Sequence, residues 1–337
     1  VDLNGQPPIH AYARVIAEPE IRIASIDHGV HVVIRDLDDL MDYRSPESKF
    51  GLAKAALALG GFSSEAAGWP REARSLADRL RLFGGGIELT TLAAIPSGSG
   101  LGTSSIMGAV LTAVIRRMTG RPEEPRRLFH EVLRLEQELT TGGGWQDQVG
   151  GVLPGVKMIT TEPGLVPDPR IQYVPADILD PRTGAGRVLL YYTGMRRLAK
   201  NILHEVVGSY LDRDRGAMDA LRRIHAFPPA MVEALAAKDL ERFGRRLGEA
   251  WELKKRIDPD STTPVIEAIL RQAGPMLLGA KLMGAGGGGF LLLACRSAEA
   301  ARAVRAELEA HPPNDRARFF EFGDAERRSP FGVAVVN

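Results

Sequence analysis

Two clusters of glycine constrain the fold of this sequence more than any other feature. The first lies in Pro96-Ser-Gly-Ser-Gly-Leu-Gly-Thr-Ser-Ser105, and the second is Gly284-Ala-Gly-Gly-Gly-Gly289. Glycine has no side chain, so it tolerates positive φ angles and lets another group come close to the backbone. The fold must therefore bring something against the main chain at both places.

The first cluster has the composition of a phosphate-binding loop. It follows a strand-like run at residues 87–94 and precedes a helical pattern that stops at Gly120. Its closely spaced glycines let backbone N–H groups turn toward an anion, and the following helix adds the positive end of its dipole. The loop matches neither GxxxxGK[ST] nor GxGxxG, and the alternative is a glycine turn with a serine N-cap. The residues expected to bind phosphate are Pro96, Gly98, Ser99, Gly100, Leu101, Gly102, Thr103, Ser104 and Ser105.

A carboxylate at Glu136 lies on the apolar side of the next predicted helix, residues 125–139. Phe129, Val132 and Leu133 form the apolar stripe, and Glu136 continues it four residues after Val132. A buried carboxylate is costly unless a cation meets it, and Mg²⁺ binds one or two carboxylates together with phosphate oxygens. The alternative is a surface glutamate paired with the arginines at positions 127 and 134.

Asp147 follows three glycines and a tryptophan, in Gly142-Gly-Gly-Trp-Gln-Asp-Gln148. A single aspartate in a turn is usually a cap or a turn former. Together with a phosphate loop and a glutamate suited to a metal, it completes the parts that phosphoryl transfer to a hydroxyl group requires. Asp147 is then the candidate catalytic base, which accepts the proton of the hydroxyl.

The second glycine cluster joins two strand-like runs, although a hairpin needs only one or two glycines. Five glycines in six residues imply that something large passes close to this backbone. We expect the substrate there, and we expect Trp145, which its flanking glycines leave little to pack on, to stack against that substrate. The candidate substrate-binding residues are Gly143, Gly144, Trp145, Gln146, Gly284, Ala285, Gly286 and Gly287.

The composition excludes several other classes of protein. The chain has 337 residues, 44% of them hydrophobic, with 43 Lys+Arg against 42 Asp+Glu, so it forms a sizeable core and is no dedicated nucleic-acid binder. Its apolar runs are too short to span a membrane. The single cysteine permits no internal disulfide, which favours the reducing cytoplasm. The element order favours an α+β fold of two closely packed lobes, and a β-β-α-β order at the end predicts a ferredoxin-like half.

Taken together, these segments resemble the GHMP kinases. The second motif of that family, P-x-x-x-G-L-G-S-S, corresponds to residues 96–104 with Thr103 in place of the first serine, and its third motif corresponds to residues 281–290. The resemblance implies that ATP is the phosphate donor, that Ser104 and Glu136 ligate Mg²⁺, and that Asp147, eleven residues after the glutamate, is the base.

Three phrases narrow the resemblance to the L-fucokinase branch: residues 140–151, 190–194 and 1–8. The branch implies a kinase that phosphorylates the anomeric hydroxyl of L-fucose or a close relative, in fucose salvage toward GDP-fucose. One alternative is a heptose phosphate kinase, which a basic cluster of Arg196, Arg197 and Lys200 would favour. Another is a non-catalytic sugar or nucleotide sensor on the same fold.

The resemblance also implies a division of the chain. We expect an N-terminal lobe like domain 2 of ribosomal protein S5 at residues 1–186, and a ferredoxin-like C-terminal lobe at residues 187–337. The first family motif is expected upstream of Val1, so the chain reads as a kinase core whose beginning has been cut away. The expected partners are a small sugar and ATP, with no nucleic acid and no membrane, and with a pyrophosphorylase domain upstream in the parent protein.

Overall fold

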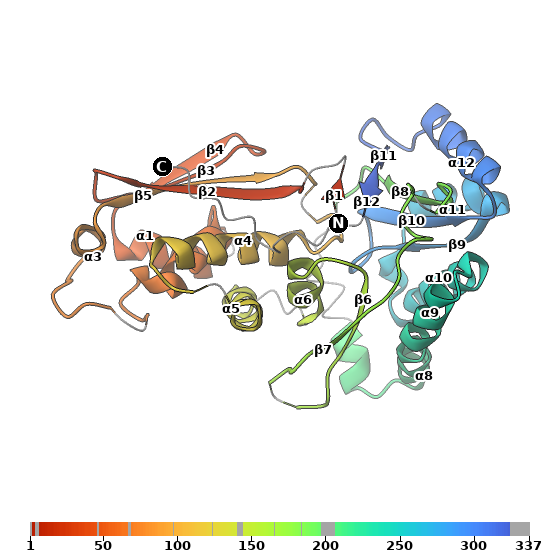
Figure 1. The fold of residues 1–337 in the computed structure, drawn as a ribbon, viewed down its shortest axis with the longest axis horizontal. Helices are drawn as coiled ribbons and strands as arrows, with labels where there is room; N and C mark the ends of the chain where they lie inside the picture. The colour runs from red at the N-terminus through yellow and green to blue at the C-terminus, as the bar shows by residue number, and fades with distance from the viewer. Residues whose placement is uncertain are drawn as a thin grey trace. The chain divides into compact units, whose positions relative to one another are not determined.

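A computed structural model describes residues 2–3, 7–45, 47–66, 69–96, 98–122, 124–139, 144–164, 166–182, 184–196 and 206–323 (Figure 1). These residues form two compact units. The N-terminal unit comprises Pro8–Ile95 and Gly102–Leu153. The C-terminal unit comprises Pro96–Leu101, the described residues before Pro8, and residues 154–323. The chain therefore passes between the units in the middle of the first glycine cluster.

The N-terminal unit contains a four-stranded sheet in the order β2-β5-β3-β4. Strand β5 pairs antiparallel with β2 and parallel with β3, and β3 pairs antiparallel with β4. The sequence predicts strands at residues 10–16, 21–26 and 30–34, separated by the turn formers Glu18-Pro19 and Asp27-His28-Gly29. The structure confirms these strands. The strands are β2 (Ile9–Ile16), β3 (Ile21–Ser25), β4 (Val30–Ile34) and β5 (Gly86–Ala93).

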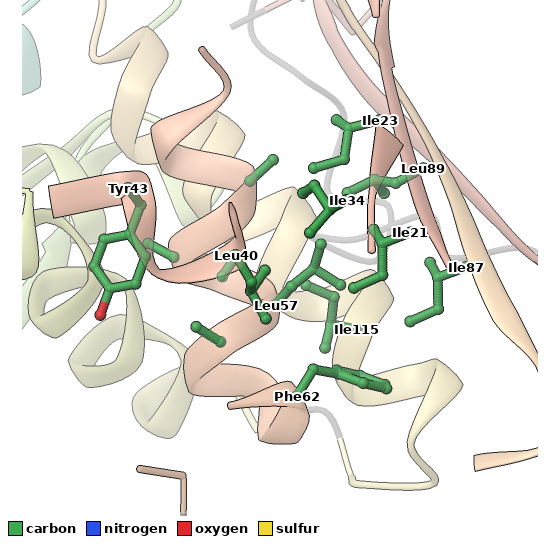
Figure 2. Packing of buried hydrophobic residues seen from close by; sticks show 14 of the residues in the cluster. Ile21, Ile23, Ile34, Leu40, Tyr43, Leu57, Phe62, Ile87, Leu89 and Ile115 are labelled. Carbon is green, nitrogen blue, oxygen red and sulfur yellow. The ribbon is translucent and has the colours of Figure 1, made fainter. Parts of the chain in front are cut away.

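Helices pack on one face of this sheet and enclose its core. Alternate residues of β3 are buried, as expected for a strand with one covered face. Figure 2 shows isoleucine and leucine side chains of the strands meeting Leu57 of α2, Ile115 of α4 and Phe62, all of them buried. The helical elements are α1 (Leu37–Met41), η1 (Asp42–Arg44), α2 (Gly51–Leu57), η2 (Ala58–Phe62), α3 (Leu76–Phe83), α4 (Thr103–Met118), α5 (Pro125–Glu138) and α6 (Gln146–Val152).

The C-terminal unit contains a second four-stranded sheet, entirely antiparallel, in the order β11-β8-β10-β9. The chain order β9-β10-α12-β11 is the β-β-α-β tail that the sequence predicted. Two short ribbons, β1-β12 and β6-β7, complete the pairing among the described strands. The strands are β1 (Asp2–Leu3), β6 (Lys157–Thr160), β7 (Arg170–Tyr173), β8 (Val188–Tyr192), β9 (Leu277–Leu282), β10 (Phe290–Cys295), β11 (Arg318–Phe320) and β12 (Phe322–Gly323).

Both faces of this second sheet are covered. Leu189, Leu291 and Leu293 pack with residues of α11 and α12, whereas Val188 and Ala294 pack with α9 and α10. Asp239 precedes the apolar helical stripe at residues 240–251, which predicts it as an N-cap. Its side chain accepts a hydrogen bond from the N–H of Arg242, which confirms this. The helical elements are α8 (Arg215–His225), α9 (Phe227–Ala236), α10 (Leu240–Ile257), η3 (Pro259–Ser261), α11 (Pro264–Ala273), η4 (Gly274–Met276) and α12 (Ala298–Ala310).

The boundary of one element differs from the sequence-based expectation. The apolar residues at 152–159 predict a strand, but Val152 ends α6, and a bend at Gly155, where φ is +80°, precedes β6. Residues 154–182 also group with the C-terminal unit, although the sequence assigned them to the N-terminal lobe. The boundary between lobes at residues 186 and 187 stays a prediction. Among the described residues, no helix has the length and apolar character needed to cross a membrane.

Candidate active site

The first glycine cluster forms a turn that leads directly into α4. Gly98, Gly100 and Gly102 all have positive φ angles, between +68° and +80°. Gly102 is the N-cap residue of α4, and no side chain caps the helix. The alternative of a serine N-cap is therefore wrong. The first turn of α4, at Thr103, Ser104 and Ser105, has the geometry of an anion-binding helix N-terminus. Ser97 lies outside the described residues.

Glu136 is buried, and its carboxylate meets the start of α4. The Ser104 hydroxyl donates to Oε1 over 2.7 Å, and the Ser105 hydroxyl donates to Oε2 over 2.7 Å. The alternative of a surface glutamate fails, because Arg127 pairs with Glu131 and Arg134 with Glu138. The predicted proximity of Ser104 and Glu136 is thus present within the N-terminal unit.

The donor set around Glu136 fits a magnesium ion in chemistry. A carboxylate and a hydroxyl lie side by side, and both are hard oxygen ligands of the kind that Mg²⁺ prefers. No group of three or more His, Cys, Asp or Glu side chains gathers in the described part of the chain. Such an all-protein cage is not needed for Mg²⁺, which completes its shell with water and phosphate oxygens.

Gln148 holds Glu136 from a third direction, and the sequence analysis missed it. Its side-chain Nε2 donates to Glu136 Oε2, and the residue is almost fully buried on α6. The sequence did contain a sign of its importance, because Gln148 belongs to the same segment, Gly142-Gly-Gly-Trp-Gln-Asp-Gln148, as Asp147. A polar residue of a short helix gives no periodic pattern, however, so the phrase alone did not show that it faces inward.

Asp147 lies in the first turn of α6, beside the glycine that begins α4. A Cβ atom placed on Gly102 would lie 3.4 Å from both Cβ and Cγ of Asp147. The residue as a whole is exposed, yet its carboxyl group is partly desolvated by surrounding protein. That desolvation, followed by repulsion from the Glu136 carboxylate, raises the pKa of Asp147. A carboxylate with a raised pKa and an open side is suited to accept a proton from a ligand.

The other candidates near Asp147 are placed less fully. Trp145 is half-buried and is the N-cap residue of α6, while Gly144 and Gln146 are exposed. Gly143 lies outside the described residues. Of the basic cluster, Arg196 is exposed, and residues 197 and 200 also lie outside the described residues. Sugar stacking by Trp145 stays a prediction.

The second glycine cluster packs against the first. A Cβ atom on Gly284 would lie 2.9 Å from the carbonyl oxygen of Gly100, and one on Gly289 would lie 2.7 Å from the carbonyl carbon of Ser99. The N–H of Phe290 donates to Ser99 O over 3.1 Å. What passes close to this backbone is therefore the chain itself, whereas the glycine content alone had indicated a substrate.

A further segment approaches the same cluster from the other end. The N–H of Gly287 donates to Ser261 O over 2.6 Å, and a Cβ atom on Gly286 would lie 2.7 Å from Ser261 Cα. Gly286 and Gly287 are buried, whereas Gly284 is exposed and Ala285 is half-buried. Contact between these four residues and a substrate stays a prediction.

Comparison with known proteins agrees with these motifs. The sequence model for the N-terminal domain of GHMP kinases matches residues 71–155, and the model for their C-terminal domain matches residues 231–314. The chain belongs to the GHMP kinase family. The first match covers the phosphate loop, Glu136 and Asp147, and the second covers the glycine cluster at 284–289.

Within this GHMP kinase family, two similar relatives carry fucokinase names. The chain is 40% identical over 95% of its length to L-fucokinase/L-fucose-1-P guanylyltransferase of Bacteroides fragilis, and 33% identical over 94% to bifunctional fucokinase/GDP-fucose pyrophosphorylase of Arabidopsis thaliana. It spans 34% and 28% of the lengths of these relatives. D-glycero-alpha-D-manno-heptose 7-phosphate kinase of Campylobacter jejuni is 30% identical over 60% of this chain and 59% of its own length.

Solved structures confirm the α+β GHMP kinase fold. A mevalonate kinase aligns with a TM-score of 0.63 at 16% identity, covering 94% of this chain and 89% of its own. Galactokinase of Lactococcus lactis, solved with galactose, aligns with a TM-score of 0.61 at 16% identity, covering 93% of this chain and 85% of its own. Identities this low establish the fold, and the chemistry must be argued from the residues of this chain.

Proposed function

We propose that this chain is a kinase that transfers the terminal phosphoryl group of ATP to the anomeric hydroxyl of L-fucose. One observation carries the proposal: the exposed Ser104, at the start of α4, donates a hydrogen bond to the buried carboxylate of Glu136, and Asp147 lies beside the N-cap glycine of the same helix. The similarity to two fucokinases over nearly the whole chain supports fucose as the acceptor.

In the proposed reaction, the loop at residues 96–105 holds the ATP phosphates. Its left-handed glycines turn backbone N–H groups toward the anion, and the N-terminus of α4 adds its dipole. Ser104 and Glu136 would hold Mg²⁺, with Gln148 and Ser105 fixing the orientation of the carboxylate. When bound, the metal ion neutralises charge on the phosphates.

Asp147 would act as the base. The raised pKa of Asp147 lies closer to neutral pH than the pKa of an ordinary aspartate. This favours proton uptake from the sugar hydroxyl as the hydroxyl oxygen attacks phosphorus. Because the ionised form must do this work, activity falls as the pH drops through the raised pKa. Trp145, Gly144 and Gln146 precede the base in the chain and would contact the sugar.

We further propose that the parent protein joins this kinase to a domain that consumes its product. The names of both fucokinase relatives give two activities each, and both proteins extend well beyond the aligned region. A fucose 1-phosphate made here would be the substrate of such a guanylyltransferase.

The test is ADP release by the full-length protein with L-fucose, D-arabinose and heptose phosphates, each with and without Mg²⁺. We expect turnover with L-fucose that requires Mg²⁺ and is lost in Asp147→Asn. Turnover only with a heptose phosphate would assign the chain to the other kinase, which the Campylobacter relative represents. Nucleotide binding without turnover of any sugar would support a sensor instead.

A further inference from the structure

The loop at residues 96–105 contains no lysine or arginine, although a nucleotide polyphosphate carries several negative charges. Backbone N–H groups and hydroxyls supply only partial charges there. Apart from the Mg²⁺ of the proposed function, any full positive charge near the loop would have to come from a side chain in another part of the chain. The C-terminal unit offers one candidate whose position is fixed by a hydrogen bond.

That candidate is Lys254, on the helix α10. Its ammonium group donates to the carbonyl oxygen of Gly284, in the second glycine cluster. Gly284 itself packs against Gly100, with 2.9 Å between the position of an added Cβ and Gly100 O. The lysine thus ends beside a residue that touches the middle glycine of the phosphate loop. The contacts that link them all lie within one compact unit.

The surroundings of Lys254 disfavour its positive charge, unlike those of a lysine on the protein surface. Lys281 on β9 repels it, and Asp258, the buried residue before η3, attracts it. Within the described residues, no charge on α8 or α9, which also pack on α10, adds to these effects. Desolvation by burial, with the Lys281 repulsion second, lowers the pKa of Lys254 to about 7.

The next residue shows what an ordinary lysine does on this helix. Lys255 pairs with Glu252 over 2.7 Å and with Glu267 over 3.2 Å, and these partners raise its pKa. Two adjacent lysines therefore have opposite environments. Lys255 has its charge satisfied by carboxylates on the protein, whereas the environment of Lys254 disfavours its charge until an anion arrives.

We propose that Lys254 binds the polyphosphate of the nucleotide and takes up a proton as the nucleotide binds. This inference rests on the proposed function, in which the loop at residues 96–105 holds ATP. It adds a specific cation and a proton-linked step to that site. The geometry commits Lys254 to the nucleotide rather than to a phosphorylated sugar, because its carbonyl partner lies against the loop.

The sign of the pH dependence follows from the lowered pKa. Well below this pKa Lys254 is already protonated in the free protein, so nucleotide affinity should not change with pH on its account. Above pH 7 the free protein must take up a proton to bind, so affinity should fall by up to about tenfold per pH unit. The fall ends at the higher pKa that the bound phosphate gives the ammonium group.

The experiment is calorimetric titration of full-length wild type, Lys254→Gln, Lys254→Arg and the control Lys255→Gln with Mg·ADP, at pH 6.5 and pH 8.5. We expect Lys254→Gln to bind about 10- to 100-fold more weakly, as for loss of one charged hydrogen bond. Lys255→Gln should bind within about threefold of wild type, as its charge is already paired. Lys254→Arg should keep most of the affinity.

Proton uptake is read from the same titrations repeated in Tris and in HEPES, whose ionisation enthalpies differ. At pH 8.5 we expect wild type and Lys255→Gln to take up protons as Mg·ADP binds. In Lys254→Gln the proton uptake that Lys254 contributes should be absent. Equal affinity and equal uptake in Lys254→Gln and wild type would overturn the inference. If wild type and the Lys255 control also fail to bind Mg·ADP, the proposed function itself is wrong. A normal melting temperature for Lys254→Gln, or retained binding in Lys254→Arg, excludes misfolding as the cause.

Discussion

At the scale of single residues, a buried carboxylate organises the candidate site. Glu136 accepts hydrogen bonds from Ser104, Ser105 and Gln148, and its charge is the second cause of the raised pKa of Asp147. The two carboxylates thus have different environments and, we propose, different tasks. Glu136 is oriented by hydroxyl and amide donors, while Asp147 keeps an exposed side for a ligand.

The first prediction concerns Asp147. Replacing it with asparagine should lower kcat by about 10²- to 10⁴-fold, the range for loss of a general base. Nucleotide affinity should change little, because the loop and Glu136 are untouched. Steady-state kinetics with saturating L-fucose and ATP, together with nucleotide titration, measure both. A variant that keeps more than about a tenth of the wild-type kcat would remove Asp147 from this role.

The second prediction concerns Glu136. Replacing it with glutamine preserves the shape of the side chain and removes its charge, so the half-saturating Mg²⁺ concentration should rise and activity should recover partly at high Mg²⁺. Glu138→Gln is the matched control, because Glu138 lies on the same helix and faces Arg134 and Arg44. The same Mg²⁺ dependence in both variants would contradict the assignment.

Sequence alone predicted part of this geometry, for a physical reason. The 3.6-residue period of a helix placed Glu136 on the buried stripe, and the structure confirms that position. The contribution of Gln148 and Lys254 could not be predicted in the same way. Gln148 lies in a helix too short to show a period, and the partner of Lys254 is 30 residues away in the sequence.

At the scale of elements, the two glycine clusters are best understood as one structure. Each cluster removes the side chains that would keep the other away, so the backbone at Gly284 and Gly289 supports the backbone at Gly100 and Ser99. Composition predicted a close approach at each cluster. It did not predict that the clusters approach each other, because pairing over such a distance leaves no local pattern.

The third prediction tests this mutual support. Gly284→Ala should displace the phosphate loop, because the added methyl group would meet Gly100 and because φ at Gly284 is +69°. We expect nucleotide affinity to fall about tenfold or more, and the free energy of unfolding to fall by about 1–3 kcal/mol. Gly274→Ala is the control, because nothing lies within 4 Å of its added Cβ. Equal nucleotide affinity in the two variants would show that the loop does not depend on this contact.

At the scale of the whole molecule, the compact units do not follow the order of the chain. The N-terminal unit is interrupted by residues 96–101, which belong with the C-terminal unit. The sequence predicted the element order of both sheets and the β-β-α-β tail, since these depend on local patterns. The predicted boundary between the lobes, at residues 186 and 187, divides the sequence at a single point. Contacts between residues can instead group segments that are far apart in the sequence.

The fourth prediction follows from this crossing. Residues 154–337 produced alone should show no cooperative thermal transition, because the backbone of Ser99 and Gly100 no longer covers the cluster at 284–289. Production together with residues 1–153 should restore a folded complex, which circular dichroism and size-exclusion chromatography would detect. A cooperative transition in the isolated fragment would show that the loop segment is dispensable for folding.

The same crossing limits how relatives of this chain can exchange parts. A gene hybrid joined at a single point between the units would pair the glycine cluster of one parent with the loop segment of the other. Two backbones in contact without intervening side chains leave little room to adjust to a foreign partner. Hybrids that keep residues 96–101 and 283–290 from one parent should therefore survive recombination more often than those that separate them.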